Sequence, residues 1–175
     1  AGFILTGVIA LNKSGLSASL FYLTTYAFST LAAFGVITLV RDATGEVTDL
    51  NKWAGLGKKS PLIAGAFAFL LLSFAGIPLT SGFIGKFAIF SAAYETGNIA
   101  VVVFGVLSSA LAAFFYIRVI LLMFISEPQI DSVSIAIPSL RSRIAITTTT
   151  AASLILGIFP SLLLNITQSF ALFIK

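Results

Sequence analysis

The apolar segment IAVVVFGVLSSALAAFFYIRVILLMF, residues 99–124, carries one charged residue, Arg118, and places the strongest constraint on the fold. About 20 apolar residues in a helix cross the ~30 Å hydrocarbon core of a bilayer. The rest of the chain is similar, since it is 58% hydrophobic and 9% charged. Soluble domains carry about 25% charged residues. We therefore expect an all-α integral membrane protein, a polytopic bundle of transmembrane helices.

Polar segments divide this bundle into successive spans. We expect residues 1–175 to form a single membrane domain, with helices at about 16–40, 61–94, 99–124 and 144–164. The apolar run 1–11 is too short to cross a bilayer. It has neither a basic start nor a small-residue cleavage site, which argues against a signal peptide. We interpret it as the tail of a transmembrane helix, which makes the chain a C-terminal fragment of a longer protein.

The ten basic residues indicate a topology and not a nucleic-acid partner. They are scattered, without the aromatic-basic patch of a nucleic-acid surface. Alternating spans place the loops 41–60 and 125–143 on one side, together with most of the loop charges: Arg41, Lys52, Lys58, Lys59, Arg141 and Arg143. Lys13 and Lys175 lie on the other side. The positive-inside rule then predicts that these two loops are cytoplasmic and that the C-terminus is outside.

The absence of cysteine and histidine limits the chemistry of the chain. It excludes thiolate-bound iron–sulfur clusters, Cys/His zinc sites and Ser-His or Cys-His nucleophiles within these 175 residues. We therefore expect no redox centre and no cofactor on this chain.

The stretch SFAGIPLTSGFIGKFAIF, residues 73–90, predicts a break within one transmembrane helix. A continuous helix over 61–94 would be about 51 Å long, well beyond the hydrocarbon core. Each half alone is too short to cross it. Pro78 removes a backbone donor, and Gly76 and Gly82 permit unusual dihedral angles. We therefore expect residues 75–82 to be non-helical, and broken helices of this kind line ion pathways in transporters.

Lys86 lies just after the predicted break. Loss of water and the positive end of the second half-helix disfavour its ammonium, whereas carbonyls freed by the break favour it. Such a lysine is suited to loading and releasing a proton, and ionisable residues inside membranes are functional by default. The alternatives are a snorkelling or lipid-facing lysine and a static ion pair. The helices at 16–40, 99–124 and 144–164 contain no carboxylate, so a partner would come from elsewhere. Arg118 could either snorkel to the headgroups or pair across helices.

Two longer strings resemble a known family. FLLLSFAGIPLTSGFIGKFAIFSAAYETG and the following GVLSSALAAFFYIRVILLMF are similar to the C-terminal part of the antiporter-like subunit N of bacterial respiratory complex I. The resemblance covers most of residues 1–125 and implies an antiporter-like inverted-repeat fold. It also implies that Lys86 is a proton relay toward the outer side, and that Gly76, Pro78, Gly82 and Gly85 shape the break and admit water.

The resemblance further implies a proton-translocating membrane-arm subunit of NADH:quinone oxidoreductase in a bacterial inner membrane. NADH, FMN, iron–sulfur clusters and quinone would act elsewhere in that complex, and the partners would be other membrane-arm subunits and lipid. One alternative is a subunit of a multi-subunit cation/proton antiporter, which shares the broken helix. Another is a structural membrane subunit in which Lys86 is inert.

Overall fold

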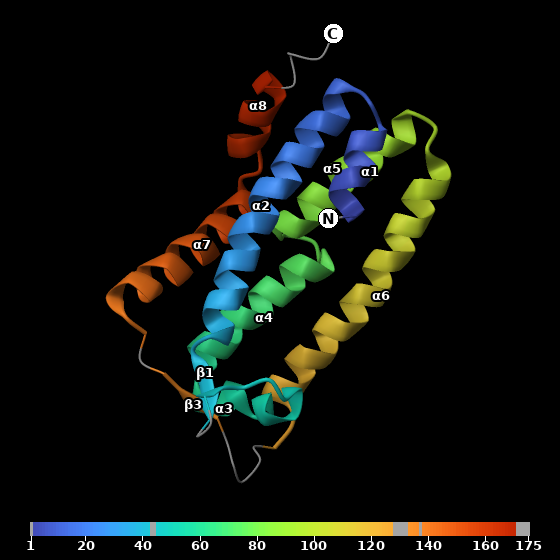
Figure 1. The fold of residues 1–175 in the computed structure, drawn as a ribbon. Coiled ribbons are helices and arrows are strands. Elements are labelled where there is room, and N and C mark those ends of the chain that lie inside the picture. Colours follow the sequence, from blue (N-terminus) through green and yellow to red (C-terminus); the bar gives the residue numbers. More distant parts are fainter. Residues whose placement is uncertain (1, 43–44, 128–132, 137, 171–175) are drawn as a thin grey trace.

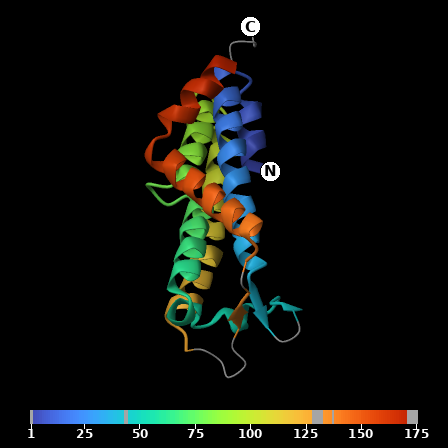
Figure 2. The same ribbon diagram turned by 90° about the vertical axis from the view of Figure 1, so that its left-hand side faces the viewer.

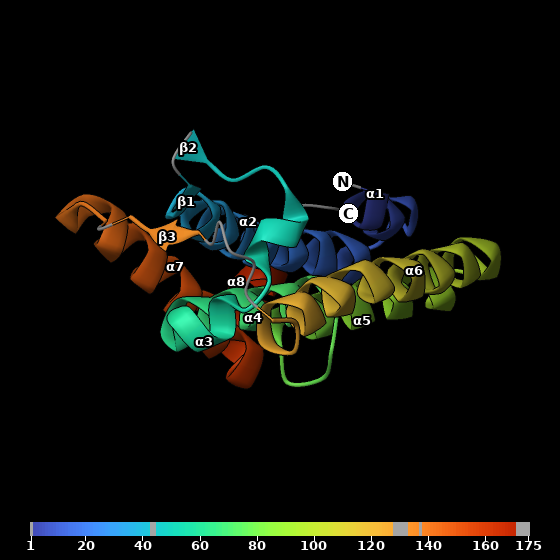
Figure 3. The same ribbon diagram turned by 90° about the horizontal axis from the view of Figure 1, so that it is seen from below.

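The computed structural model describes residues 2–42, 45–127, 133–136 and 138–170. This part of the chain forms an elongated bundle of helices (Figure 1). A small sheet and the short helix α3 (Leu56–Lys59) lie at one end, seen from below in Figure 3. The α1–α2 and α5–α6 connections lie at the opposite end. The predicted outside position of Lys175 and the C-terminus falls outside the described residues.

Helices α1 (Gly2–Ile9) and α2 (Lys13–Ile37) are joined by a tight turn. The side chain of Asn12 caps α2 by accepting a hydrogen bond from the Gly15 amide at 2.6 Å. A Cβ on Gly15 would overlap the carbonyl oxygen of Gly7, so glycine allows the two helices to approach closely. The apolar pattern predicted a helix at 16–40. It ends earlier because the chain enters strand β1 at Val40.

The loop after α2 is folded onto the end of the bundle. Strand β1 (Val40–Asp42) pairs antiparallel with both β2 (Gly45–Glu46) and β3 (Ser134–Ile135), in the order β2-β1-β3. A 3-10 turn, η1 (Leu50–Trp53), precedes α3. The sheet therefore holds the loop after α2 and the loop after α6 (Ile99–Phe124) at the same end of the molecule.

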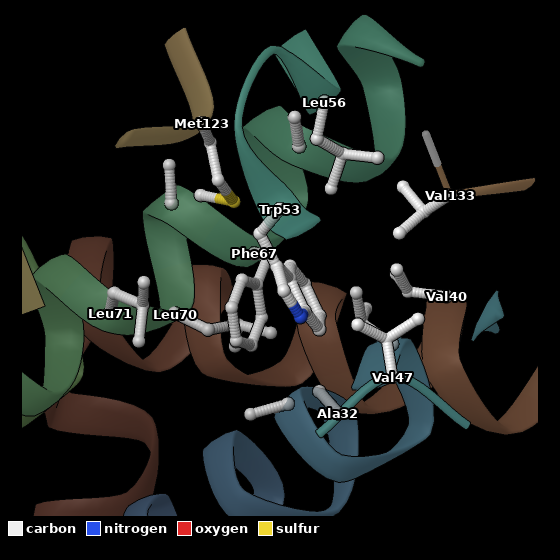
Figure 4. Close-up of a cluster of buried hydrophobic side chains, with 14 residues drawn as sticks. Ala32, Val40, Val47, Trp53, Leu56, Phe67, Leu70, Leu71, Met123 and Val133 are labelled. Carbon is white, nitrogen blue, oxygen red and sulfur yellow. The ribbon is translucent and has the colours of Figure 1, made fainter. Parts of the chain in front are cut away.

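A buried apolar cluster packs the sheet end of the molecule against the helices (Figure 4). The indole of Trp53 is 4% exposed and packs on Phe67, with ring centroids 5.2 Å apart. Leu56 of α3 and Met123 of α6 are fully buried in the same cluster. Burying such side chains stabilises by roughly 1.5–3 kcal/mol each, so the polar loop is firmly attached to the bundle.

Helices α4 (Pro61–Ala75) and α5 (Ser81–Glu95) follow one another along the bundle, with residues 76–80 between them. Together they extend over about the same height as α2, and the connecting segment projects to one side (Figures 1 and 2). The break is shorter than the predicted 75–82. Gly82 can stay helical because the Thr80 side chain caps α5 two residues earlier.

The last helical region differs from the predicted single helix at 144–164. Helix α7 (Leu140–Ile158) ends before Pro160, and α8 (Ser161–Phe170) leaves it at an angle of 86°. Proline has no amide hydrogen and disfavours helical geometry in the preceding residue. Phe159 accordingly has φ −120° and ψ 65°. Among the described residues, two helices, α2 and α6, are long and apolar enough to cross a membrane, and the α7–α8 pair would make a third span.

Candidate functional site

At the break, helix α4 ends in a hydrogen-bonded C-terminal cap. Gly76 has φ +80°, a conformation that favours glycine. Its amide donates to the carbonyl of Ser73 at 3.0 Å, and the amide of Ile77 donates to Leu72 at 3.1 Å. These two bonds form a Schellman motif, which ends a helix while satisfying part of its last turn. The carbonyls of Phe74 and Ala75 are left for other donors.

Lys86 supplies those donors. Its Nζ donates to the carbonyl of Phe74 at 2.7 Å and to that of Ala75 at 3.3 Å. A third bond, 2.8 Å long, goes to the hydroxyl of Ser109 on α6. An ammonium has three N–H donors, so each one has a partner. The side chain therefore reaches back across the break from the second turn of α5 to the negative end of α4.

Lys86 is buried and has no counter-charge beside it in the part of the chain that the structure describes. The residue is 5% exposed. Its Nζ lies 4.8 Å from the ring centroid of Phe3, a cation–π contact from α1. The salt bridges among the described residues, Lys52–Asp42 and Lys58–Glu127, do not involve it. A buried lysine held only by neutral groups is not locked into the charged form by a carboxylate.

Two cavities meet at Lys86. One, of about 510 Å³, lies between α1, α2 and α6 and includes Tyr22, Tyr26 and Tyr116 in its lining. The other, of about 320 Å³, lies between α5 and α6 and includes Gly76 and Ser109. Both are large enough for several water molecules, whose share of liquid volume is about 30 Å³ each. Lys86 lines both, so one side chain borders both spaces.

The four residues predicted to shape the break take different positions. Gly76 and Pro78 lie in the break, whereas Gly82 and Gly85 lie in the first turns of α5. A Cβ on Gly82 would overlap the carbonyl of Ser73, and one on Gly85 would lie 2.7 Å from the ring of Tyr22. These two glycines therefore set how closely α5 approaches α4 and α2.

Arg118 is not brought to this site. Arg118 lies nine residues after Ser109, about 14 Å farther along α6, and it is exposed. No hydrogen bond or ion pair joins it to the residues that the structure describes. The snorkelling and pairing alternatives for Arg118 both stay open.

Sequence reasoning did not identify Ser109 and Phe3 as site residues. Ser109 belongs to a row of small residues at four-residue spacing, Gly105, Ser109 and Ala113, which indicates helix packing as readily as chemistry. The one signal was its hydroxyl in a largely apolar helix, and the neighbouring Ser108 carries the same signal. Phe3 carries no signal, because its contact with Lys86 joins segments far apart in the sequence.

Comparisons with known proteins assign the chain to a family. The family model described as NADH:quinone oxidoreductase/Mrp antiporter, transmembrane, matches residues 1–112. A curated relative, NADH-quinone oxidoreductase subunit N of Rhodococcus opacus strain B4, is 56% identical over all 175 residues, which cover 32% of its length. The chain thus spans about a third of the length of the curated relatives it matches.

Two solved structures have the same fold. Respiratory complex I from Thermus thermophilus with bound aureothin gives a TM-score of 0.78 at 29% identity, over 93% of this chain and 36% of that chain. The Mrp complex from Dietzia sp. DQ12-45-1b gives a TM-score of 0.81 at 25% identity, over 98% of this chain and 40% of that chain. The all-α membrane fold and the resemblance to subunit N, both predicted from the sequence, are confirmed by these matches.

Proposed function

Because the chain belongs to the NADH:quinone oxidoreductase/Mrp antiporter transmembrane family, we propose that it is part of subunit N of a proton-translocating NADH:quinone oxidoreductase. In this proposal Lys86 takes up and releases the transported proton. The observation that carries the proposal is a buried ammonium with neutral partners at the junction of two half-helices and two cavities.

The proton path follows from these contacts. Water in the cavity of about 510 Å³ exchanges a proton with Nζ on one side, and water in the cavity of about 320 Å³ does so on the other. In the charged form, the carbonyls of Phe74 and Ala75 and the hydroxyl of Ser109 stabilise the ammonium. In the neutral form, the amine has two N–H donors and a lone pair, so it can donate to the two carbonyls while the Ser109 hydroxyl donates to the nitrogen. Gly76 and Pro78 keep the helix open so that the carbonyls face the lysine.

The driving force enters from elsewhere in the complex. The chain has no cysteine to bind an iron–sulfur cluster. In this proposal, NADH, FMN, iron–sulfur clusters and quinone act on other subunits. Quinone reduction there would change the electrostatic field along the membrane arm and shift the protonation of Lys86. The partners of the chain are then the other membrane-arm subunits and the lipid of a bacterial inner membrane.

We also propose the sidedness predicted from the loops. The sheet end of the bundle, with Arg41, Lys52 and Lys58, would face the cytoplasm. The opposite end, with Lys13, would face outward. Spans that alternate in direction would place the loop after α2 and the loop after α6 on the same side of the membrane. The structure is consistent with this, because the two loops meet in one sheet.

Replacing Lys86 by methionine in the full-length subunit of the intact complex tests the proposal. Methionine has a similar length and cannot carry a proton. We expect an assembled complex that has lost coupled proton pumping and turns over more slowly, measured as quinone-linked NADH oxidation together with proton uptake. The matched control is Lys58→Met at the exposed sheet end, whose side chain is 54% exposed in the ion pair with Glu127. Normal pumping and normal turnover in Lys86→Met would exclude the relay role.

The similarity to the Mrp complex supports one alternative, a subunit of a cation/proton antiporter. The 56% identity to subunit N favours the oxidoreductase. The oxidoreductase and the antiporter can be distinguished by what each needs for transport. An antiporter exchanges protons along a sodium or potassium gradient without NADH or quinone. A structural subunit with an inert Lys86 is the remaining alternative, and it predicts wild-type pumping in Lys86→Met.

A further inference from the structure

Four buried serine side chains lie together beside the break. They are at most 2% exposed and come from α2, α4, α5 and α7: Ser29, Ser73, Ser81 and Ser153. We call them the serine cluster. Ser73 and Ser81 flank the break, whereas Ser29 and Ser153 come from distant parts of the sequence, and none of the four is bonded to Lys86. The proton path described above does not use them.

Ser153 is the member that joins α7 to the break. Its Oγ lies 2.8 Å from the Oγ of Ser29 on α2 and 3.1 Å from the Oγ of Ser81, the first residue of α5. Ser81 in turn lies 3.4 Å from the hydroxyl of Ser73 on α4. The Ser73 hydroxyl accepts a hydrogen bond from the Gly82 amide at 3.2 Å. The cluster thus joins the end of α4 directly to the start of α5 through Ser73 and Ser81, and Ser153 joins the start of α5 to α7 and α2.

Gly157, one turn after Ser153, brings the backbone of α7 directly against the break. A Cβ at this position would lie 2.7 Å from the amide nitrogen of Ser81 and 3.0 Å from the carbonyl oxygen of Leu79. Real side chains do not approach backbone this closely, so only glycine fits without movement. Ser153 and Gly157 therefore place one face of α7 on the segment where α5 begins.

The serine cluster is poorly suited to conduct protons itself. At one end, Ser73 receives its bond from a backbone amide, which does not release a proton. Its position suggests another role. Ser73 immediately precedes Phe74 and Ala75, whose carbonyls bind Lys86, and Ser81 lies five residues before Lys86 on the same helix. The distance from Nζ to these carbonyls therefore depends on how the two half-helices are held together.

The connecting segment alone holds them weakly. Ile77, Pro78 and Leu79 are exposed, and Leu79 has φ +72°, a strained conformation for a residue with a side chain. We propose that Ser153 and Gly157 of α7 are positioning residues for Lys86. They fix the start of α5, to which α4 is bonded through Ser73, and so keep the lysine amine against the carbonyls of Phe74 and Ala75. This inference rests on the proposed function of Lys86 as a proton relay.

The test uses Ser153→Ala and Gly157→Ala in the full-length subunit of the intact complex, with Lys86→Met beside them. Proton pumping is measured per assembled complex, together with NADH oxidation, so that a smaller amount of complex does not change the result. We expect Gly157→Ala to reduce pumping by about tenfold, because misplacement of a reacting group by about 1 Å can cost 100-fold. We expect Ser153→Ala, which loses the buried contacts with the hydroxyls of Ser29 and Ser81, to reduce it by about 2- to 10-fold.

Each variant has a matched control in the same protein. Gly65→Ala adds the same methyl group to α4 at a position where nothing lies within 4 Å. Thr148→Ala removes a hydroxyl from α7 that bonds only the carbonyls of Ile144 and Ala145 in its own helix. Both controls should assemble and pump as the unmodified complex does.

The outcomes separate this inference from the proposed function. Normal pumping in Lys86→Met would overturn both. Lost pumping in Lys86→Met with normal pumping in Ser153→Ala and Gly157→Ala would overturn the positioning role alone. Failure of both α7 variants to assemble, with Lys86→Met assembled, would also overturn it, because α7 would then be needed for folding and not for positioning.

Discussion

Replacing Ser109 by alanine removes one of the three hydrogen bonds of Lys86 while leaving its two carbonyl partners in place. The bond is 2.8 Å long, and the lysine is 5% exposed. A hydrogen bond to a charged group contributes about 1.5–3 kcal/mol. Ser109 also lines the cavity of about 320 Å³, so a water molecule can replace part of the lost interaction. We therefore expect the charged form of Lys86 to lose about 1.4 kcal/mol, a factor of about ten in its population relative to the amine.

The assay is proton pumping by the intact complex, normalised to the amount assembled. We expect Ser109→Ala to assemble normally and to pump up to about tenfold more slowly, which is the rate effect of about 1.4 kcal/mol when all of it falls on the step that protonates Lys86. Ser109→Thr keeps the hydroxyl next to an open cavity and should retain most of the rate. Ser169→Ala, which removes an exposed hydroxyl bonded only to Ile166 of α8, serves as the control. Unchanged pumping in Ser109→Ala, or an equal loss in Ser109→Thr, would refute the assigned role of the hydroxyl.

Three further predictions concern the break and the topology. Gly82→Ala should destabilise the subunit by more than about 2 kcal/mol, because its Cβ would overlap the carbonyl of Ser73. The complex should then inactivate faster on heating, whereas Gly65→Ala should leave the rate of thermal inactivation unchanged. Leu79→Gly should stabilise the subunit by up to about 1 kcal/mol by relieving φ +72°, visible as slower thermal inactivation, and a faster rate would contradict the strain. Lys58→Cys should react with a membrane-impermeant maleimide only in vesicles that expose the cytoplasmic face, whereas labelling from the outside alone would reverse the proposed topology.

Local chemistry made the broken helix predictable. Pro78 and Gly76 interrupt an apolar stretch that is too long for one continuous span, and the structure has two helices there, with Lys86 shortly after the break. The lysine could be identified because an ionisable residue inside a membrane segment is rare. The same reasoning could have located the bend between α7 and α8, since Pro160 gives the same signal as Pro78. The prediction of one helix at 144–164 gave apolar length more weight than this proline.

The partners of Lys86 could not be predicted in this way. Ser109 and Phe3 approach it through helix packing, and neither has a local pattern that distinguishes it from other packing residues. The same holds for Ser153 and Gly157, which reach the break from α7, more than 70 residues along the chain. Contacts between distant segments depend on how every helix in the bundle is packed, and the sequence pattern of one helix does not contain that information.

The central claim is that Lys86 must lose and regain a proton and does not serve only as a fixed positive charge. Arginine separates these roles, because it keeps the charge and several N–H donors but is not deprotonated in proteins. The decisive measurement is proton pumping by the assembled complex with Lys86→Arg, compared with Lys86→Met. We predict that both variants lose pumping. Pumping that is lost in Lys86→Met but retained in Lys86→Arg would contradict the relay and would make Lys86 a structural cation at the end of α4.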